Sequence, residues 1–351
     1  MRRTGLLHRL ALATMPILVS ACASSAPATA TPTISGPALA VVKVGVRPGI
    51  PATTSHAVWV PNTGDGTVSK IDPASNRVVA TLHIGNQLAF YHRDCEAKGS
   101  VHSFMVTSFH VRDCDLPSSL AGGAGSLWVA KNDDQAVWRI NPSTDQVIAR
   151  VPVGLVPFDM AASESAVWVT GYWTDQLVRI DPATNTVVAR LTLPDGPSGI
   201  AISDQAVWVA STIAGQVMRI DPFTNQIVAT IPLACPTACF QGSLPLTLAL
   251  TSNALWVRTT GDGLVVRVDP ATNTVVSTIP VSYPLGRNGQ DRIVAFNGGV
   301  WVCGTNLQRI DPQTNTIASS IGVSATSVIA GFGSLWITDI LGRVERLPAT
   351  S

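Results

Sequence analysis

Short hydrophobic runs recur along the chain at intervals of roughly 40 residues, and each carries a Trp-Val or Trp-Ile pair. A second run, such as residues 176–180, follows about ten residues after each Trp, and an Asp-Pro turn and a β-branched run such as 186–191 come next. No segment between the pairs has helical periodicity. The pairs begin at Trp59, Trp128, Trp168, Trp208, Trp256, Trp301 and Trp336, so the pattern predicts seven copies of one unit of four short strands.

Asp or Asn followed by Pro ends the third strand of six units. The side chain of the first residue caps the backbone, and Pro presets φ at the second position. Five of these turns end on Asn, a residue that tolerates left-handed backbone. The dipeptides are Asp72-Pro73, Asn141-Pro142, Asp181-Pro182, Asp221-Pro222, Asp269-Pro270 and Asp311-Pro312, and the exit residues are Asn76, Asn185, Asn225, Asn273 and Asn315.

The two ends of the repeat region complement each other. The seventh unit stops at Leu347-Pro348-Ala349 and lacks its post-turn strand, whereas residues 38–44 resemble a post-turn strand without a unit of their own. Pairing them completes the ring and leaves no unit open. The sequence therefore predicts an all-β, seven-bladed β-propeller of four-stranded antiparallel blades over residues 38–351, whose last blade is closed by the N-terminal strand. The repeated Trp residues are interpreted as packing between blades.

Residues 1–21 are typical of a cleaved signal peptide, with Arg2 and Arg3 before an apolar stretch. The sequence 19–22, Val-Ser-Ala-Cys, resembles the lipobox of bacterial lipoproteins, which implies lipidation of Cys22; the alternative is an ordinary signal peptide with a chance Cys. Residues 22–37, rich in Ala, Ser, Thr and Pro, are expected to be a flexible tether. We therefore expect an extracytoplasmic protein that is lipid-anchored to the bacterial cell membrane or outer membrane.

Charge excludes one large class of partners. Only 13% of the residues are charged, and removing Arg2, Arg3 and Arg9 from the 23 basic residues leaves 20 against 22 acidic ones. A nucleic-acid-binding protein needs a basic face or stripe, so no nucleic-acid partner is expected. The sequence also contains no phosphate-binding loop or dinucleotide motif, and we predict no cofactor.

The units resemble the YVTN-repeat β-propeller family and its relative, the virginiamycin B lyase (streptogramin lyase) group. The resemblance spans residues 38–348 and is carried by segments such as 206–210, 215–222 and 224–232. It implies a seven-bladed propeller, often in the cell envelope, that serves as a binding platform. The lyases use His and Glu residues of their late blades with magnesium. Here no His follows His110, and Glu345 is the only Glu after Glu164, so the catalytic residues of the lyases cannot be transferred to this sequence.

Every insertion falls in a segment that joins two units, at residues 86–118, 234–246 and 282–292. In an up-and-down blade these segments and the turns after the Trp strands lie on one face, which makes that face the expected binding surface. Neutral drift of loop length is the alternative.

The insertions also hold most of the cysteines. Cys95 and Cys114 lie in the first insertion and Cys235 and Cys239 in the second, which predicts two local disulfides in an oxidising envelope. Cys303 is expected to be a small buried residue. Zinc bound by the four loop cysteines is an alternative, and His92, His102 and His110 are metal-capable, but their spacing is not that of a tight metal site, and we predict none.

Nine residues before each Trp lies a position expected to ring the mouth of the propeller, and only the third and sixth units place a charge there, Asp159 and Arg292. These two charges could bind a ligand or merely neutralise each other. Aromatic and further charged residues are expected on the same face, so the predicted ligand- or partner-binding set is Phe158, Asp159, Tyr172, Trp173, Asp175, Lys131, Arg258, Arg287, Asp291 and Arg292.

Three functions remain open. The favoured one is a non-enzymatic, monomeric envelope lipoprotein whose propeller face binds an envelope protein or a small polar ligand. The second is a C–O lyase like streptogramin lyase, with an Asp such as Asp159 or Asp291 as the base. The third is a purely structural envelope scaffold. No catalytic residue is assigned.

Overall fold

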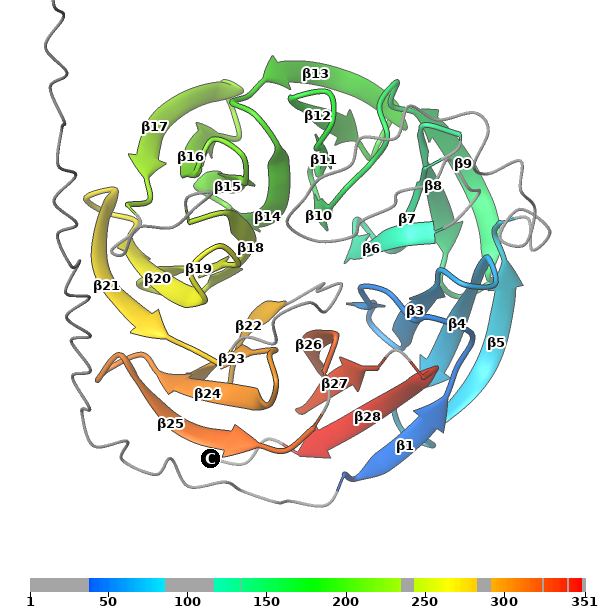
Figure 1. Cartoon of the computed structure of the whole chain (residues 1–351). Helices are drawn as coiled ribbons and strands as arrows, with labels where there is room; N and C mark the ends of the chain where they lie inside the picture. Colours follow the sequence, from blue (N-terminus) through cyan, green and yellow to red (C-terminus); the bar gives the residue numbers. More distant parts are fainter. Residues whose placement is uncertain are drawn as a thin grey trace, which may run out of the picture. The chain divides into compact units, whose positions relative to one another are not determined.

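The computed structural model describes residues 38–85, 117–132, 134–234, 243–282, 292–323, 325–339 and 341–348. The proposed leader, Cys22 and the tether lie outside these ranges, as do Cys95, Cys114, Cys235, Cys239, Arg287 and Asp291. The described residues form seven antiparallel sheets of four strands, arranged in a ring (Figure 1). The predicted all-β, seven-bladed propeller is therefore confirmed. No helix in these ranges is long and apolar enough to cross a bilayer.

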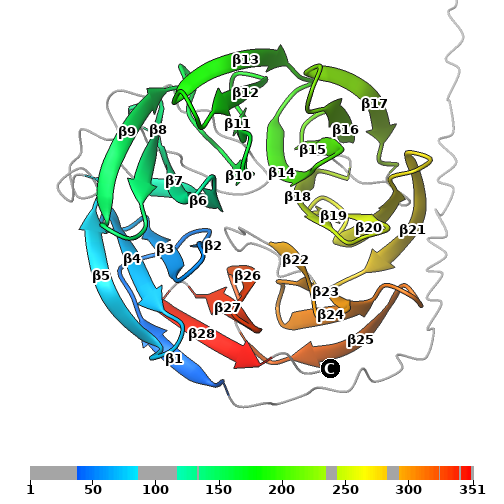
Figure 2. The same ribbon diagram turned by 180° about the vertical axis from the view of Figure 1, so that it is seen from behind.

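Each blade runs outward from the axis in chain order, and Figures 1 and 2 show the ring from its two sides. Blade 1 contains β2 (Ala52–Thr53), β3 (Val58–Asn62), β4 (Thr67–Asp72) and β5 (Arg77–His83). Blade 2 contains β6 (Pro117–Gly123), β7 (Ser126–Lys131), β8 (Ala136–Asn141) and β9 (Gln146–Pro152). Blade 3 contains β10 (Met160–Ala162), β11 (Val167–Gly171), β12 (Gln176–Asp181) and β13 (Thr186–Thr192). Blade 4 contains β14 (Pro197–Ser203), β15 (Ala206–Ser211), β16 (Gln216–Asp221) and β17 (Gln226–Pro232).

The later blades repeat this order. Blade 5 contains β18 (Pro245–Leu250), β19 (Leu255–Thr259), β20 (Leu264–Asp269) and β21 (Thr274–Pro280). Blade 6 contains β22 (Ile293–Phe296), β23 (Gly299–Val302), β24 (Leu307–Asp311) and β25 (Thr316–Ile321). Blade 7 contains β26 (Ser327–Gly331), β27 (Ser334–Thr338) and β28 (Arg343–Pro348), and its outer strand is β1 (Ala40–Lys43). The register of β1 on β28, from Ala40 opposite Arg346 to Lys43 opposite Arg343, confirms the predicted closure.

The inner strands of blades 2 and 5 begin earlier than the insertions at 86–118 and 234–246 had implied. β6 starts at Pro117 and β18 at Pro245. The first position of a strand is one where Pro is tolerated, because it cannot donate to the ladder. The predicted insertions therefore overlap these two strands by two residues each.

The repeated Trp residues lie in the second strand of each blade and are at most 1% exposed. Each packs with the Val, Leu and Ile of the adjacent blade, as Trp128 does with Val167, Val178 and Ile180. Burial of a side chain of this size contributes on the order of 4–6 kcal/mol before entropy is counted. This confirms that the Trp repeat is a packing position, and Cys303 is buried in the same kind of cluster.

The Asp-Pro turns follow the predicted chemistry. Asp72 accepts hydrogen bonds from the amides of Ala74 and Ser75, and its equivalents behave similarly. All five exit Asn residues have positive φ, from 54° to 57°, and Asp145 replaces Asn in blade 2 with a φ of 58°. These turns lie at the opposite end of the blades from the segments between blades. We call this end the turn face, and the end with the blade-joining segments (for example 193–196) and the turns after the Trp strands (for example 172–175) the insertion face.

A repeated cation locks neighbouring blades together at the turn face. Arg179 lies 5.4 Å from the ring centroid of Trp168, and its Nη1 donates to the carbonyl of Pro222 and the side chain of Asn225 in the next blade. The same contacts are made by Arg139, Arg219, Arg267 and Arg346, and by Lys70 with Asp145. We call these contacts the inter-blade clasps. In each clasp, one cationic side chain makes both a cation–π contact with the Trp ring of its own blade and charge-assisted hydrogen bonds to the turn of the next blade.

The clasp is missing at one junction of the ring. Arg309 of blade 6 occupies the equivalent position, and its Nε is buried without a partner like those of Arg179 and Arg219, but among the described residues Arg309 makes no hydrogen bond to blade 7. Blade 7 draws its outer strand from β1, so no Asp-Pro turn joins its two outer strands. Because the ring is closed by the N-terminal strand, blade 7 lacks the Pro carbonyl and the exit side chain that accept the clasp bonds at the other junctions.

Candidate functional site

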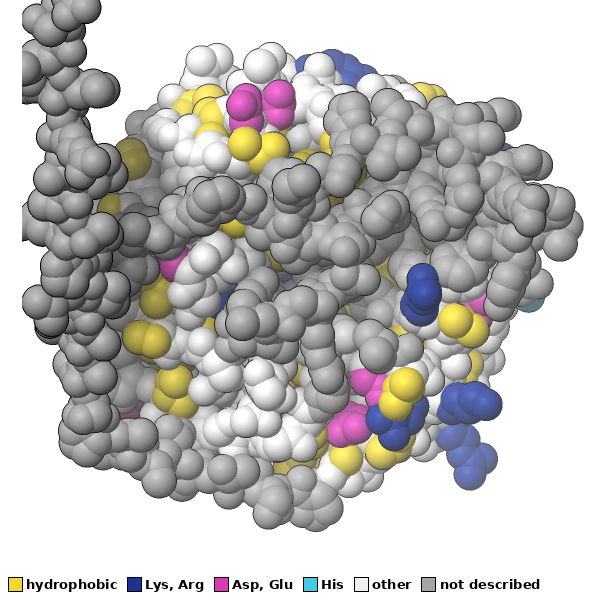
Figure 3. All heavy atoms as spheres, viewed as in Figure 1, with side chains coloured by type: hydrophobic (Ala, Val, Ile, Leu, Met, Phe, Trp, Pro, Cys, Tyr) yellow, Lys and Arg dark blue, Asp and Glu magenta, His cyan; other side chains and the backbone are white. Residues whose placement is uncertain are grey.

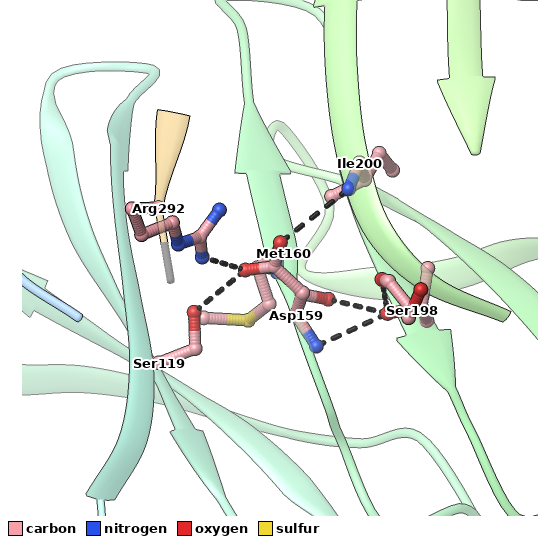
Figure 4. A network of polar contacts seen from close by, with 7 residues as sticks. Ser119, Asp159, Met160, Ser198, Ile200 and Arg292 are labelled. Atoms are coloured by element: carbon pink, nitrogen blue, oxygen red, sulfur yellow. Dashed lines mark hydrogen bonds and ion pairs between the residues drawn. The ribbon is translucent and has the colours of Figure 1, made fainter. Parts of the chain in front are cut away.

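Asp159 and Arg292 form an ion pair across the centre of the ring. Asp159 immediately precedes β10 in blade 3, and Arg292 immediately precedes β22 in blade 6. Arg292 Nη2 lies 2.5 Å from Asp159 Oδ1, although the two residues are 133 positions apart (Figure 4). Both were predicted at the mouth because they occupy the same register position, and the structure shows that their charges compensate each other.

The carboxylate of Asp159 is held on several sides. It is 2% exposed, and its Oδ1 also accepts from the Ser119 hydroxyl at 3.1 Å and the Met160 amide at 2.9 Å. Its Oδ2 accepts from the Ile200 amide of blade 4 at 3.4 Å. A buried carboxylate needs such donors. Besides the Met160 amide of its own blade, Asp159 receives them from blades 2, 4 and 6. The ion pair therefore fixes the inner strands of the ring at the insertion face.

Hydroxyl groups extend this network toward blades 4 and 5. Thr170 Oγ1 donates to the carbonyl of Ser198 at 2.7 Å and accepts from the Asp159 amide at 3.0 Å. Thr212 Oγ1 lies 2.7 Å from both Ser198 Oγ and the carbonyl of Pro245. The polar contacts thus follow the inner strands from blade 3 to blade 5.

Some polar atoms at the mouth have hydrogen-bonding capacity that the described residues do not use. Arg292 Nε and Ser327 Oγ are both buried without a hydrogen-bond partner. Ser327 occupies in blade 7 the register position that Asp159 occupies in blade 3. Buried polar atoms normally have partners, so these two atoms are suited to contacts from a ligand or from water.

An aromatic cluster lies beside the ion pair. Phe158 precedes Asp159, and its amide donates to the carbonyl of Thr170 at 2.8 Å. Its ring centroid lies 5.1 Å from Tyr172 in a stacked arrangement and 6.0 Å from Trp173. Tyr172 and Trp173 belong to the turn after β11 and meet edge to face at 5.1 Å. Tyr172 is buried, whereas Phe158 and Trp173 are half-buried and present apolar surface at the rim.

Two carboxylates flank this cluster. Asp175 Oδ1 accepts from the Gly196 amide at 2.9 Å, which brings Asp175 next to the segment containing Asp195. Burial, together with the negative charge of Asp175, raises the pKa of Tyr172 to about 12. The field of Asp175 therefore acts on the aromatic rings.

Lys131 and Arg258 lie inside the blades rather than at the rim. Lys131 is 1% exposed, its Nζ donates to the carbonyl of Ile84 at 3.0 Å, and it lies 4.8 Å from the ring centroid of Trp138. Arg258 is fully buried and donates to the carbonyls of Thr259 and Leu264. The long stems of both side chains fold into the blade, which the sequence position after the Trp did not reveal.

The structure brings together some of the residues that were predicted to bind a ligand or partner, and it adds others to them. Phe158, Asp159, Tyr172, Trp173, Asp175 and Arg292 share the insertion face near the axis. Asp195 and Ser198 were not predicted, whereas the register had placed Ser119 at the mouth, at the position in blade 2 that Asp159 occupies in blade 3. Within the described ranges, no three His, Cys, Asp or Glu residues lie close enough to hold a metal ion.

Comparisons with known proteins bear on the fold. The chain is similar to the crystal structure of virginiamycin B lyase from Staphylococcus aureus, with a TM-score of 0.68 and 14% identity over 89% of this chain and 99% of that one. It is also similar to a streptogramin B lyase structure, with a TM-score of 0.66 and 16% identity over 88% of this chain and 97% of that one. The fold is that of the virginiamycin B lyase-like seven-bladed β-propellers. At this identity the likeness concerns the fold alone. No protein-family model and no curated protein matches the sequence.

Proposed function

We propose that this chain is a non-enzymatic, lipid-anchored cell-envelope protein whose insertion face binds a protein partner or a small polar ligand. One observation carries the proposal: the half-buried rings of Phe158 and Trp173 lie beside a rigid, buried ion pair on the face that receives every insertion. Aromatic anchors on a rigid base are the groups that dominate recognition energies.

The regularity of the other face supports this assignment. The turn face repeats the same clasp at six junctions, so its side chains are engaged in holding blades together. The insertion face differs from blade to blade in both loop length and side chains. A repeat protein that varies on one face generally binds with that face.

The test compares two exposed aromatic residues on opposite faces. Trp173→Ala removes a ring from the insertion face, and Phe223→Ala removes an 80% exposed ring from the turn face. Tagged wild type and both variants are cross-linked in cells and then analysed by native mass spectrometry. We expect a discrete protein or small-molecule adduct that Trp173→Ala loses and Phe223→Ala retains. Loss in both variants, or only in Phe223→Ala, contradicts the proposal.

The envelope location is tested separately through Cys22. The Val-Ser-Ala-Cys sequence at 19–22 and the apolar stretch before it support lipidation at this thiol. Wild type is expected to incorporate labelled fatty acid and to partition into detergent, and Cys22→Ser is expected to do neither. Equal labelling of the two proteins would mean that Cys22 is not the acceptor.

A lyase is the second candidate, because the two solved structures cited above are named as virginiamycin B lyase and streptogramin B lyase. The resemblance implies His and Glu residues in the late blades of such enzymes, but no His follows His110 here, and Glu345 is the only Glu after Glu164. Incubation with a streptogramin B antibiotic and magnesium decides between the two functions. Linearised product that disappears with Asp159→Asn would replace the binding proposal with the lyase.

A purely structural scaffold is the third candidate, and it predicts a different result. A scaffold would tolerate Trp173→Ala without losing its neighbours in the envelope, because many contacts would share the binding energy. The cross-linking comparison above therefore separates it from a localised binding site.

A further inference from the structure

The turn after β11 differs from the equivalent turns of the other blades. In blade 3 it places Tyr172 and Trp173 where blade 1 has Thr63-Gly64, blade 4 has Thr212-Ile213 and blade 5 has Thr260-Gly261. Phe158, from the segment before β10, completes the cluster in the same blade. Blade 3 therefore carries an aromatic group that the fold itself does not require.

The planes of these rings form two walls. Phe158 and Tyr172 stack at an interplanar angle of 30°, and Trp173 is inclined to them at 66° and 62°. Steeply inclined rings with partly exposed faces are the arrangement that surrounds ammonium and guanidinium groups, because each ring face is electron-rich.

The carboxylates beside these walls are not neutralised. Asp175 and Asp195 make no ion pair with any described residue, and Asp175 accepts its side-chain bond from a neutral donor, the amide of Gly196. Burial and, to a smaller extent, the negative charge of Asp175 raise the pKa of Tyr172, which is consistent with the place of Asp175 three residues after this ring. The rim of blade 3 thus combines electron-rich ring faces with two unpaired negative charges.

No described cation of this face forms an ion pair with these two carboxylates. Arg292, the cation nearest along the polar network, is already paired with Asp159. The exposed Lys43 and Arg343 belong to β1 and β28 in blade 7, and the exposed Arg190 belongs to β13 in blade 3, with its guanidinium near Gly154. Figure 3 shows Lys and Arg side chains in both regions and acidic side chains beside the end of β13, but among the described residues none of these three cations forms an ion pair with Asp175 or Asp195. Within the described part of the insertion face, the charges of Asp175 and Asp195 are therefore not compensated by an ion pair.

We propose that the rim formed by Phe158, Tyr172, Trp173, Asp175 and Asp195 binds a Lys or Arg side chain presented by a segment of a protein partner. This inference rests on the proposed function and names the chemistry of its partner. The cation would lie against the ring faces while Asp175 and Asp195 supply the opposite charge, which is the complementarity that steers and orients a basic segment. Half-buried rings at a rim favour a side chain presented on a chain over an enclosed small molecule.

The test observes Trp173 directly. The purified protein is labelled with 5-fluorotryptophan, and the fluorine resonance of residue 173 is assigned with Trp173→Phe. The probes are three capped octapeptides in which Gly alternates with Arg, Gln or Glu, together with tetramethylammonium as a small cation. We expect a saturable shift of the Trp173 signal with the Arg peptide, and none with the Gln or Glu peptides.

Matched variants separate charge from packing. Asp175→Asn retains the acceptor for the Gly196 amide and tolerates the positive φ of 52° at this position. In the double variant with Asp195→Asn, the Arg peptide is expected to bind about tenfold more weakly. The control pair, Asp204→Asn with Asp221→Asn, removes two carboxylates elsewhere and should leave the affinity unchanged.

Three outcomes would overturn the inference: equal binding by the double variant, equal binding of the Gln peptide, or tighter binding of tetramethylammonium than of the Arg peptide. The last result would assign the rim to a small organic cation. If the Arg peptide fails but the in-cell adduct still depends on Trp173, the binding face stands and only its preference for cations is wrong. Loss of both results removes the proposed function itself.

Discussion

The two faces of this propeller are built by opposite rules. At the turn face, one short pattern of a cation, an Asp-Pro turn and an exit Asn recurs, and it produces the same contacts at junction after junction. At the insertion face, an ion pair between Asp159 and Arg292 occurs once, and an aromatic cluster occurs in one blade. Repetition therefore marks the residues that build the ring, and its interruption marks the residues for which we propose a role in recognition.

The largest effect is expected from the repeated core that supports both faces. Trp208→Ala deletes a side chain that is 1% exposed and leaves a cavity between neighbouring blades. We expect a loss of about 5 kcal/mol in the free energy of unfolding, measured by denaturant titration. Trp173→Ala, at the rim, is the matched control and should cost less than about half as much. Similar losses would mean that Trp173 is a structural residue like the others.

The unique ion pair of the insertion face comes next. Arg292→Met leaves the carboxylate of Asp159 buried without its cation, and we expect a loss of about 3 kcal/mol. The double variant Asp159→Asn with Arg292→Met should recover part of this loss, because no uncompensated charge remains. Additive losses in this double-mutant cycle would show that the two charges do not depend on each other.

The clasps of the turn face give a smaller effect with an internal control. Arg179→Met removes bonds to Pro222 and Asn225, and should cost about 1–2 kcal/mol. Arg309→Met changes the same residue type at the junction where those acceptors are missing, so its cost should be well below 1 kcal/mol. Denaturant titration of the two variants side by side measures the difference, and equal costs would show that the clasp contributes nothing.

The smallest effects are opposite pH dependences of the two faces. At the turn face, backbone and Thr272 hydrogen bonds hold the pKa of Asp269 below its ordinary value. In the acid range the Asp269 carboxyl binds fewer protons in the folded protein than in the unfolded chain. Its contribution to the free energy of unfolding is therefore present at neutral pH and is lost as the pH falls through the depressed pKa. At the insertion face, the pKa of Tyr172 rises from 10.0 to about 12, so the unfolded chain ionises first and stability is lost between pH 10 and 12.

Each pH dependence has its own variant. Asp269→Asn should flatten the acid limb of the stability curve, and Tyr172→Phe should flatten the alkaline limb. Thermal unfolding across the pH range measures both. An unchanged alkaline limb in Tyr172→Phe would show that the phenol ionises as readily in the folded protein as in the unfolded chain.

The sequence predicted the fold because the signal is repeated. Seven Trp pairs, five Asp-Pro turns and one Asn-Pro turn set the number and the order of the strands, and the missing strand of the last unit predicted the pairing of β1 with β28. The clasps were missed, although the residue two positions before each turn is always Arg or Lys. A cation on an exposed strand is usually solvated, and its cross-blade acceptors become visible only when two turns are placed side by side.

The site was harder to predict because its residues come from different blades. Register placed Asp159 and Arg292 at the mouth, but no sequence rule states that one side chain reaches the other across the axis. Lys131 and Arg258 occupy rim positions in the sequence, yet both fold inward onto Trp138 or onto backbone carbonyls. Asp195 was overlooked because its place beside Asp175 depends on the bond to Gly196.

The most direct test of the account compares the two faces in living cells. A photo-cross-linking amino acid is placed at position 173 on the insertion face in one protein and at position 223 on the turn face in another, both in otherwise unchanged chains. The account predicts a discrete adduct from position 173 and none from position 223. An adduct from position 223 alone, or the same adduct from both positions, would contradict the claim that recognition belongs to the face where the repeat is interrupted.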